Sequence, residues 1–462
     1  MAHLGCLVMP SDLASAALAA SPPGFGWIEG AKLGQEWVFV ALALAPEGGE
    51  QVRTDAFARL KDHRAVHYGA MKQRLMPWIT AHRGLALALR LDMVKSLDDL
   101  AQWLHDVPVR ELVRDQFLLC CIEPGPDVLT ASFVVVIPGD NGAKDTVFAM
   151  DVEPVPAAPD PFARVRHLVP LAQLRGKRAA VIGLGSGGGF AALELAAAGV
   201  GTLHLVDRDR LRAPNLFRHI CGAADLGRTK VAAIADLIRA HDLPAEVVPH
   251  ADDILVSTDR LRAIVAEVDI VLGATDTVTS RRMLNYLCVR SGTPVIFAGT
   301  FDNARIGEII RVLPGRTACY ECTRRHLRDW GSLGSEPEAE EDAIPYGPQV
   351  SESTATGGGT RTDVFMVAAL QAKTAMTMLL ADDPTTSNIL PHDYVAWGAV
   401  PNRHFPEPFR FDYPFAAKYV TMPRWSDCPV CGLPPIDLRE IEIEKVYAEI
   451  FATQPEAEDR PS

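Results

Sequence analysis

Residues 178–207 read RAAVIGLGSGGGFAALELAAAGVGTLHLVD: an apolar run, a glycine-rich turn, an alanine-rich run and a second apolar run that ends in an acid. The turn spaces Gly183, Gly185 and Gly188 as Gly-x-Gly-x-x-Gly, which favours a tight turn whose backbone N–H groups face a phosphate. Asp207 ends the second run, where a carboxylate accepts hydrogen bonds from ribose hydroxyls. The stretch therefore predicts a nucleotide-binding α/β domain, and NAD or ATP would satisfy it equally.

A cationic segment beyond the second strand favours ATP. Asn215 and Arg218 stand in NLFR, and Lys230 ends GRTK. A carboxylate that attacks the α-phosphorus of ATP builds negative charge on the phosphate oxygens and on the departing pyrophosphate, so fixed cations lower that barrier. Hydride transfer has no such requirement. Taken singly, Arg218 would be read as a surface ion-pair residue and Lys230 as a solvated helix start; their register with the glycines favours the phosphate role.

Asp276 ends a third apolar run, VDIVLGATD. An acid at the crevice edge of a parallel sheet is well placed to hold Mg²⁺ against ATP phosphates, and the same residue could cap a helix that begins in TVTSRRMLNYL. No general base is needed, because a carboxylate nucleophile is already ionised at neutral pH. The sequence has no Gly-x-x-x-x-Gly-Lys-Ser/Thr motif, which excludes a P-loop NTPase.

The order and spacing of these motifs over about residues 164–432 resemble the ThiF/MoeB/HesA superfamily. The resemblance implies an enzyme that uses ATP and Mg²⁺ to adenylate the C-terminal carboxylate of a ubiquitin-like protein or a peptide. It also implies a homodimer, in which an arginine ahead of the glycine strand, Arg164 or Arg166, enters the neighbouring subunit's ATP site. The nucleotide contacts that it implies are Gly183, Gly185, Gly188, Asp207, Asn215, Arg218 and Lys230, with Asn215, Arg218, Lys230 and Asp276 as the catalytic set and Asp276 as the magnesium ligand.

Four cysteines form two C-x₂-C pairs, Cys319 with Cys322 and Cys428 with Cys431. Each pair can present two thiolates to one tetrahedral metal, and this spacing suits Zn²⁺. The long gap between the pairs predicts a structural zinc that ties the late part of the chain back onto the domain. Two redox disulfides are the alternative.

The segment 331–361 is rich in acid, Gly, Pro and Ser, and a loop of that length is typically functional or solvated. In the superfamily it is the crossover loop over the substrate's tail, and relatives that form a thioester carry a cysteine there. This chain has none between Cys322 and Cys428. Cys221 and Cys288 are the remaining thiols near the expected site, and these two cysteines and the pair Cys120–Cys121 favour packing over nucleophilic chemistry.

Composition bounds the class of protein. The chain has 462 residues, 48% of them hydrophobic, which allows two or three domains with full cores. Its net charge of −13 and its lack of basic stretches argue against a nucleic-acid partner. No long uncharged apolar run indicates a membrane span, and the start lacks the basic region of a signal peptide, so we expect a cytoplasmic protein.

We expect an α/β fold, a Rossmann-like mostly parallel sheet with helices on both faces, preceded by a smaller α+β domain. The expected divisions are an N-terminal domain at 1–150, a Pro-rich linker at 151–165, the adenylation domain at 166–432, and a C-terminal helix and polar tail at 433–462. Within the first, strands are expected at 36–45 and 129–138 and helices at 55–79 and 96–107.

The function expected is an ATP-dependent adenylyltransferase for a ubiquitin-like protein, such as one in a bacterial conjugation pathway against phage, with a conjugating-enzyme-like protein as an acceptor. The alternatives are adenylation of a peptide or a sulfur-carrier protein without a thioester, an NAD-dependent oxidoreductase, and a silent nucleotide-binding scaffold. A complete cationic and acidic set argues against the last two.

Overall fold

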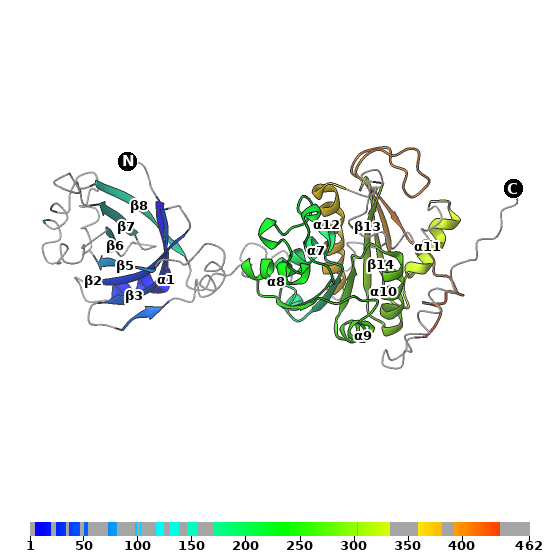
Figure 1. The fold of residues 1–462 in the computed structure, drawn as a ribbon, viewed down its shortest axis with the longest axis horizontal. Coiled ribbons are helices and arrows are strands. Elements are labelled where there is room, and N and C mark those ends of the chain that lie inside the picture. The colour runs from blue at the N-terminus through cyan, green and yellow to red at the C-terminus, as the bar shows by residue number, and fades with distance from the viewer. Residues whose placement is uncertain are drawn as a thin grey trace. The chain divides into compact units, whose positions relative to one another are not determined.

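The computed structural model consists of two compact units, Met1–Ala163 and Arg164–Ser462 (Figure 1). The residues that the structure describes are 5–19, 25–33, 37–46, 50–53, 73–80, 98, 102, 117–123, 130–137, 146–155, 171–241, 243–302, 304–332, 359–380 and 392–434.

The first unit is built on a sheet that closes on itself. Its order is β1-β8-β7-β6-β5-β2-β3-β4, and a further parallel pairing of β1 with β3 joins the ends of a seven-strand ring. A closed sheet leaves few unpaired edges. The elements are β1 (Gly5–Pro10), α1 (Ser11–Ala19), β2 (Phe25–Leu33), β3 (Trp37–Pro46), β4 (Val52–Arg53), β5 (Gln73–Thr80), β6 (Phe117–Glu123), β7 (Thr130–Ile137) and β8 (Thr146–Val155).

The two strands expected in this unit are confirmed as β3 and β7, but two other expectations need correction. Residues 73–79 form strand β5, not the end of a helix. Pro77 lies in that strand, and proline in a helix interior removes a hydrogen bond and clashes with the preceding turn. Strand β8 runs to Val155, so the first five residues of the expected linker belong to the sheet. Residues 98 and 102, inside the helix expected at 96–107, are helical.

The second unit contains an eight-stranded sheet of order β11-β10-β9-β12-β13-β14-β15-β16. The first five strands are parallel, and the last three continue the sheet in antiparallel fashion. This confirms the expected α/β fold. The strands are β9 (Arg178–Ile182), β10 (Thr202–Val206), β11 (Glu246–His250), β12 (Ile270–Gly273), β13 (Val295–Phe301), β14 (Ile306–Val312), β15 (Tyr394–Gly398) and β16 (Ala416–Val420).

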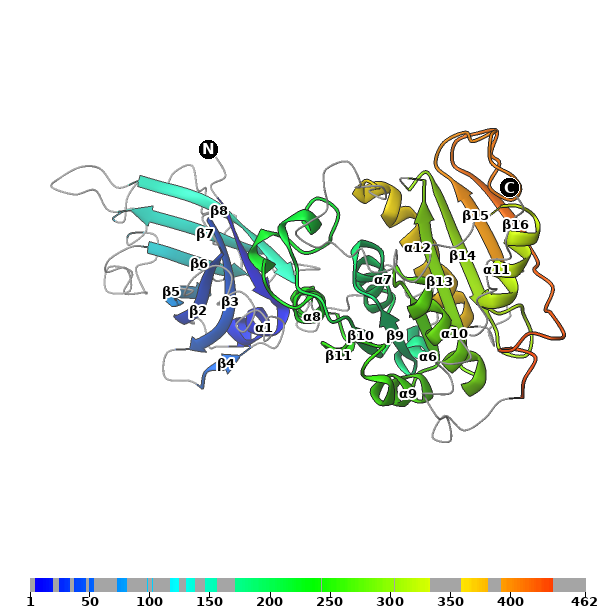
Figure 2. The same ribbon diagram turned by 45° about the vertical axis from the view of Figure 1, so that its right-hand side comes forward.

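Helices cover both faces of this sheet, because side chains of a strand alternate between the faces. In β9, Ala179 and Val181 enter one core, whereas Ala180 and Ile182 enter the other. The first core packs against α7 (Ser186–Ala197), α8 (Lys230–Ala240) and α12 (Arg361–Leu379); the second packs against α9 (Thr258–Glu267), α10 (Val278–Ser291) and α11 (Tyr320–Asp329). Figures 1 and 2 show α7 and α12 on one side of β13 and β14, with α10 and α11 on the other.

The chain order places a crevice at one end of the sheet. After β9 the chain adds β10 and β11 on one side, then returns to place β12 on the other side of β9. At such a reversal the loops after the two central strands diverge, and ligands of α/β proteins bind there, beyond the carboxyl ends of the strands.

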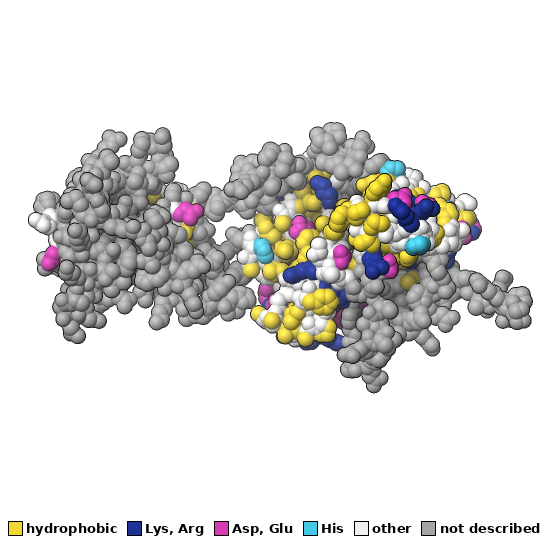
Figure 3. Space-filling model, turned by 90° about the horizontal axis from the view of Figure 1, so that it is seen from above, with side chains coloured by type: hydrophobic (Ala, Val, Ile, Leu, Met, Phe, Trp, Pro, Cys, Tyr) yellow, Lys and Arg dark blue, Asp and Glu magenta, His cyan; other side chains and the backbone are white. Residues whose placement is uncertain are grey.

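The outer surface of the second unit mixes side chains of several kinds. Figure 3 shows hydrophobic side chains interspersed with Lys, Arg, Asp and Glu side chains on one face. Among the described helices, none is long and apolar enough to cross a bilayer.

Candidate active site

The glycine-rich turn joins β9 to α7, and its three glycines have different reasons to be glycine. Gly183 has φ of +89°, and a Cβ there would lie 2.7 Å from the Ala274 carbonyl oxygen. A Cβ on Gly188 would lie 1.9 Å from the Gly183 oxygen. A Cβ on Gly185 would meet nothing within 4 Å. The first and third glycines are therefore required by the protein's own packing, whereas Gly185 leaves open space.

That open space lies at the beginning of α7. Gly185 is the N-cap of the helix and supplies no side chain to its first N–H groups. Free N–H groups and the positive end of the helix dipole form a binding site for an anion such as a phosphate.

Asp207 anchors the glycine turn from the end of β10. One carboxylate oxygen accepts a hydrogen bond of 2.7 Å from the Leu184 N–H, and the other accepts one of 2.7 Å from the Asp209 N–H. Lys230, at the start of α8, places its Nζ 2.8 Å from Asp209 Oδ2 and 3.6 Å from Asp207 Oδ2. Lys230 is buried. The sequence prediction missed Asp209, although its position two residues after the expected ribose acid was visible.

The cationic segment folds as a short 3₁₀ turn, Ala213–Asn215, followed by Arg218. The Asn215 side-chain oxygen accepts a hydrogen bond of 2.9 Å from the Arg212 N–H, so this side chain holds the turn. Arg218 is half-buried. Burial lowers the pKa of Arg218, and the negative charge of Asp276 raises it. Arg218 and Asp276 thus interact electrostatically although they come from different loops.

His219 connects this segment to the glycine turn, and the sequence prediction missed it. Its Nε2 lies 2.9 Å from the Leu184 carbonyl oxygen, and its Nδ1 accepts a hydrogen bond of 3.1 Å from the Cys221 N–H. Nε2 must therefore carry the proton. Burial lowers the pKa of His219, which favours this neutral form. Arg361, at the start of α12, donates a hydrogen bond to the His219 carbonyl oxygen.

Asp276 is exposed just beyond β12. The alternative role of helix cap falls to the next residue, because Thr277 is the N-cap of α10 and accepts a hydrogen bond of 3.3 Å from the Ser280 N–H. The Ala274 N–H donates to the Ile182 carbonyl oxygen at 2.8 Å, which joins this loop to the end of β9. Asp276 therefore lies on a loop that borders the glycine turn.

The structure thus places every residue of the expected ATP set at the carboxyl ends of β9, β10 and β12. Arg164, Arg166 and nearly all of the expected crossover loop lie outside the described residues. Cys120 and Cys121 lie on β6, but their side chains are also outside the described part of the structure.

The two thiols nearest to these residues in sequence are buried. Burial raises the pKa of Cys221 to about 12. Burial also raises the pKa of Cys288, which is fully enclosed on α10. A thiol with a raised pKa is a poor nucleophile because the thiolate is the reactive form. Both cysteines have the character of packing residues, as the sequence analysis expected.

The two C-x₂-C pairs come together as one cluster, and their four Sγ atoms lie within 4.8 Å of one another. The Sγ separations include 3.9 Å for Cys319–Cys322, 3.6 Å for Cys319–Cys428 and 3.5 Å for Cys322–Cys431. Four sulfurs at about 2.3 Å from a tetrahedral zinc would be separated by about 3.8 Å. The cluster therefore has the donor atoms and the spacing of a structural zinc site.

The surroundings of this cluster also suit a metal. A metal binds the thiolate form of cysteine, and a hydrogen bond donated to a ligand sulfur favours that form. The Trp425 N–H points at Cys322 Sγ at 3.5 Å. His326 is not a ligand, because its Nε2 lies 2.9 Å from the Pro423 carbonyl oxygen.

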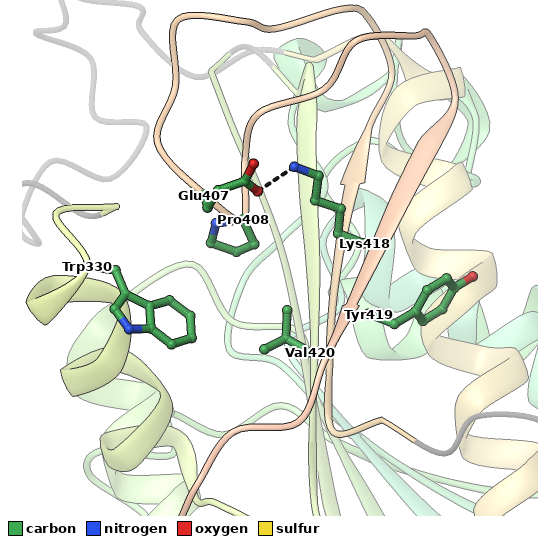
Figure 4. Close-up of a pocket in the computed structure, with 6 residues that line it drawn as sticks. All are labelled: Trp330, Glu407, Pro408, Lys418, Tyr419 and Val420. Atoms are coloured by element: carbon green, nitrogen blue, oxygen red, sulfur yellow. Dashed lines mark hydrogen bonds and ion pairs between the residues drawn. The ribbon is translucent and has the colours of Figure 1, made fainter.

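A pocket lies elsewhere in the second unit, at the opposite edge of the sheet from β11 (Figure 4). Its volume is about 550 Å³. Lys418 and Glu407, which form an ion pair, line it together with Trp330, Pro408, Tyr419 and Val420. Strands β13, β14 and β15 separate it from the strands of the candidate ATP site.

The chain is similar to known proteins over part of its length. Ubiquitin-like modifier-activating enzyme 5 of Drosophila sechellia is 28% identical over 207 residues, 41% of this chain and 51% of that protein. Adenylyltransferase and sulfurtransferase MOCS3 of Sus scrofa is 35% identical over 153 residues, which are 32% of this chain and 33% of that protein. The chain thus spans about half and a third of these relatives.

Among solved structures, E. coli MccB with ATP has 21% sequence identity and a TM-score of 0.43, covering 57% of this chain and 68% of that one. Residues 162–403, more than half of the chain, match the ThiF family, so the first cysteine pair lies within the match and the second lies beyond it. The chain belongs to the ThiF family.

Proposed function

We propose that this protein is an ATP-dependent adenylyltransferase that activates a C-terminal carboxylate. The observation that carries the proposal is the open space at Gly185, where the bare start of α7 shares the carboxyl ends of three strands with Lys230, Arg218 and Asp276. Membership of the ThiF family supports the reaction. In it, a carboxylate oxygen attacks the α-phosphorus, the bond from that phosphorus to the bridging oxygen breaks, and pyrophosphate leaves.

Each residue has a separate task in this proposal. The glycine turn and the N–H groups of α7 bind phosphate oxygens. Asp207, fixed by two backbone N–H groups, keeps lone pairs for the ribose hydroxyls. Arg218 and Lys230 neutralise the charge that develops on the phosphates. Asn215 holds the turn from which Arg218 projects.

Asp276 is the residue that would hold Mg²⁺. Its carboxylate is exposed at the crevice, and carboxylate oxygens are the ligands that Mg²⁺ prefers. A bound Mg²⁺ would screen the phosphate charge.

The acceptor in this proposal is a ubiquitin-like protein, with a peptide or a sulfur-carrier protein as the alternative. Relatives named as activators of a ubiquitin-like modifier support the first choice. The acyl adenylate is the last species formed on this chain and passes to a partner such as a conjugating enzyme. The absence of cysteine between Cys322 and Cys428 and the burial of Cys221 and Cys288 support that step.

The proposal extends to the oligomeric state, the cellular compartment and the role of the first unit. The protein works as a homodimer in a reducing cytoplasm, where the four clustered thiols can hold zinc. The family match begins at residue 162, so nearly all of the unit Met1–Ala163 lies outside it, and this unit either binds the protein substrate or has a structural or dimerising role. A conjugation pathway against phage is one setting that would use such an enzyme.

Calorimetric titration with a non-hydrolysable ATP analogue and Mg²⁺ tests the nucleotide assignment without knowledge of the acceptor. We expect saturable binding of one analogue per chain and no binding of NAD⁺ or NADH. With a candidate ubiquitin-like protein that ends in Gly-Gly, labelled pyrophosphate should exchange into ATP. Tight binding of NADH with no affinity for ATP would overturn the proposal.

A further inference from the structure

Arg281, on the first turn of α10, contacts the loop after β12 and the two neighbouring strands β13 and β14. Its Nε donates a hydrogen bond of 2.9 Å to the Thr275 carbonyl oxygen, directly before Asp276. Its Nη2 donates one of 3.0 Å to the Ala298 carbonyl oxygen on β13. Its Nη1 lies 3.8 Å from Glu308 Oε1 on β14. One guanidinium therefore connects the Asp276 loop to the two strands beside it.

Glu308 holds this guanidinium in place. Its side chain is almost completely buried, and its two oxygens have different partners. Oε1 faces Arg281 and also Arg324, whose Nη1 lies 3.2 Å away, and Oε2 accepts a hydrogen bond of 2.9 Å from the Tyr394 hydroxyl. A buried carboxylate with two arginines and a hydroxyl as partners is fully compensated, so it has little freedom to rearrange.

The Thr275–Asp276 loop has few other side-chain supports. The Thr275 hydroxyl is buried and has no hydrogen-bond partner. Gly299 leaves room for the guanidinium, because a Cβ there would lie 3.0 Å from Arg281 Nη2. The Thr275 carbonyl, by contrast, receives a hydrogen bond from a charged donor, and such bonds are stronger than neutral ones. The loop is thus oriented through its backbone by Arg281.

We infer that Arg281, held by Glu308, is a positioning residue that presents the Asp276 carboxylate to Mg²⁺ in the geometry required for the reaction. The inference rests on the proposed function and extends it to residues that contact neither ATP nor the metal. Residues that orient a metal ligand typically change metal affinity or activity about 10- to 100-fold when they are replaced. Loss of these Arg281 contacts should therefore change the Mg²⁺ concentration that nucleotide binding requires, and not only the stability of the fold.

The chain offers a matched control in the adjacent residue. Arg282 lies on the same helix, is similarly buried and pairs with Glu321 at 3.0 Å, on α11. The test variants are Arg281→Lys, which keeps the charge but cannot donate to two carbonyls in the same geometry, and Glu308→Gln, which keeps the volume and removes the charge. Arg282→Lys is the control.

The measurement is the Mg²⁺ concentration that gives half-maximal binding of the ATP analogue by the full chain, with the melting temperature recorded for each variant. For Arg281→Lys we expect this concentration to rise about tenfold or more, and for Glu308→Gln we expect it to rise in the same direction. For Arg282→Lys it should remain within about twofold, while its melting temperature falls by a similar amount to that of Arg281→Lys.

Equal Mg²⁺ requirements for Arg281→Lys and Arg282→Lys would overturn the inference, because both residues would then be purely structural. Should Arg281→Lys fail to fold, Glu308→Gln carries the same comparison. Failure of the proposed function looks different. In that case the unchanged protein would bind no ATP analogue at any Mg²⁺ concentration, which removes the ground for both statements.

Discussion

At the scale of single residues, the proposed site depends on two opposite charges that come from different loops. Arg218 follows the 3₁₀ turn after β10 and Asp276 follows β12, and the charge of Asp276 raises the pKa that burial lowers. Sequence could predict both residues, because each stands in a recognisable motif. It could not predict Arg281 or Glu308, because an arginine on a helix and a glutamate in a strand carry no signal until the fold puts them 3.8 Å apart.

Replacing Arg218 with Ala, or Asp276 with Asn, should lower adenylation about a hundredfold or more. Each change removes one charge contact to the transition state, which is worth roughly 3 kcal/mol. Pyrophosphate exchange on a confirmed acceptor measures the effect. Arg212→Ala is the control, because Arg212 is an exposed arginine of the same segment and lies outside the proposed nucleotide-binding set. Near-normal rates for both site variants would show that the site is assigned wrongly.

Two glycine substitutions should separate binding from folding. Gly185→Ala suits the local φ of −67° and meets no protein atom within 4 Å, so the melting temperature should change little while ATP affinity falls about tenfold or more. Gly188→Ala should destabilise the protein by about 1–3 kcal/mol or prevent folding, because its Cβ would overlap the Gly183 oxygen. Titration and thermal melting measure the two effects. Unchanged ATP affinity for Gly185→Ala would contradict the phosphate role of the turn.

At the scale of elements, the glycine strand and the helices around it were predictable because apolar periodicity there agrees with motif spacing. The elements of the first unit were less predictable from the sequence. Strand β5 contains Pro77, and the free-energy cost of a proline in a helix interior outweighs the helical pattern of the residues around it. Strand β8 continues through Pro154, in the part of the strand that pairs with β1. These strands form because they pair with strands far away in sequence, and the local sequence pattern does not indicate such pairing.

The contact between β10 and β11 should make stability depend on pH. His204 Nδ1 and His250 Nε2 lie 3.1 Å apart, and burial lowers the pKa of both residues below the usual 6.5. The unfolded chain therefore binds more protons than the folded one in mildly acid solution, so this contribution is present above about pH 6.5 and is lost as the pH falls through the folded pKa values. Thermal melting between pH 7.5 and 5 should show the decline.

His250→Gln should reduce that pH dependence, because one of the histidines whose pKa is lower in the folded chain than in the unfolded chain is removed. His241→Gln is the matched control, since His241 is exposed at the end of α8 and its ring contacts only the Leu237 carbonyl oxygen. The same slope in both variants and in the unchanged protein would exclude the His204–His250 pair as its source.

The cysteine cluster should hold one zinc per chain and stabilise the packing of α11 against residues 422–432. Removal of the metal by a strong chelator, or the change Cys428→Ser, should lower the melting temperature by several degrees, because the segment loses its covalent tie to α11. Elemental analysis measures the zinc, and Cys288→Ser, which alters a buried thiol outside the cluster, is the control. Zinc-free protein of unchanged stability would contradict the structural role.

At the scale of the whole molecule, the family match begins at residue 162, close to the boundary between the two units. The nucleotide residues and the cysteine cluster all belong to the second unit, whereas the first unit has its own closed sheet. A proline-rich stretch, Pro156–Pro161, comes just before this boundary. The closed ring itself could not be predicted, because ring closure depends on the pairing of β1 with β3.

The central claim is that ATP's α-phosphate ends on the acceptor's C-terminal carboxylate. The most direct measurement incubates the full chain, Mg²⁺, ATP labelled at the α-phosphorus and a ubiquitin-like protein ending in Gly-Gly, then resolves the quenched mixture. We expect labelled AMP on the acceptor, in a bond that is insensitive to thiol and is not formed by the Asp276→Asn variant. No label on the acceptor together with binding of NADH, or a thiol-sensitive bond between the acceptor and this chain, would contradict it.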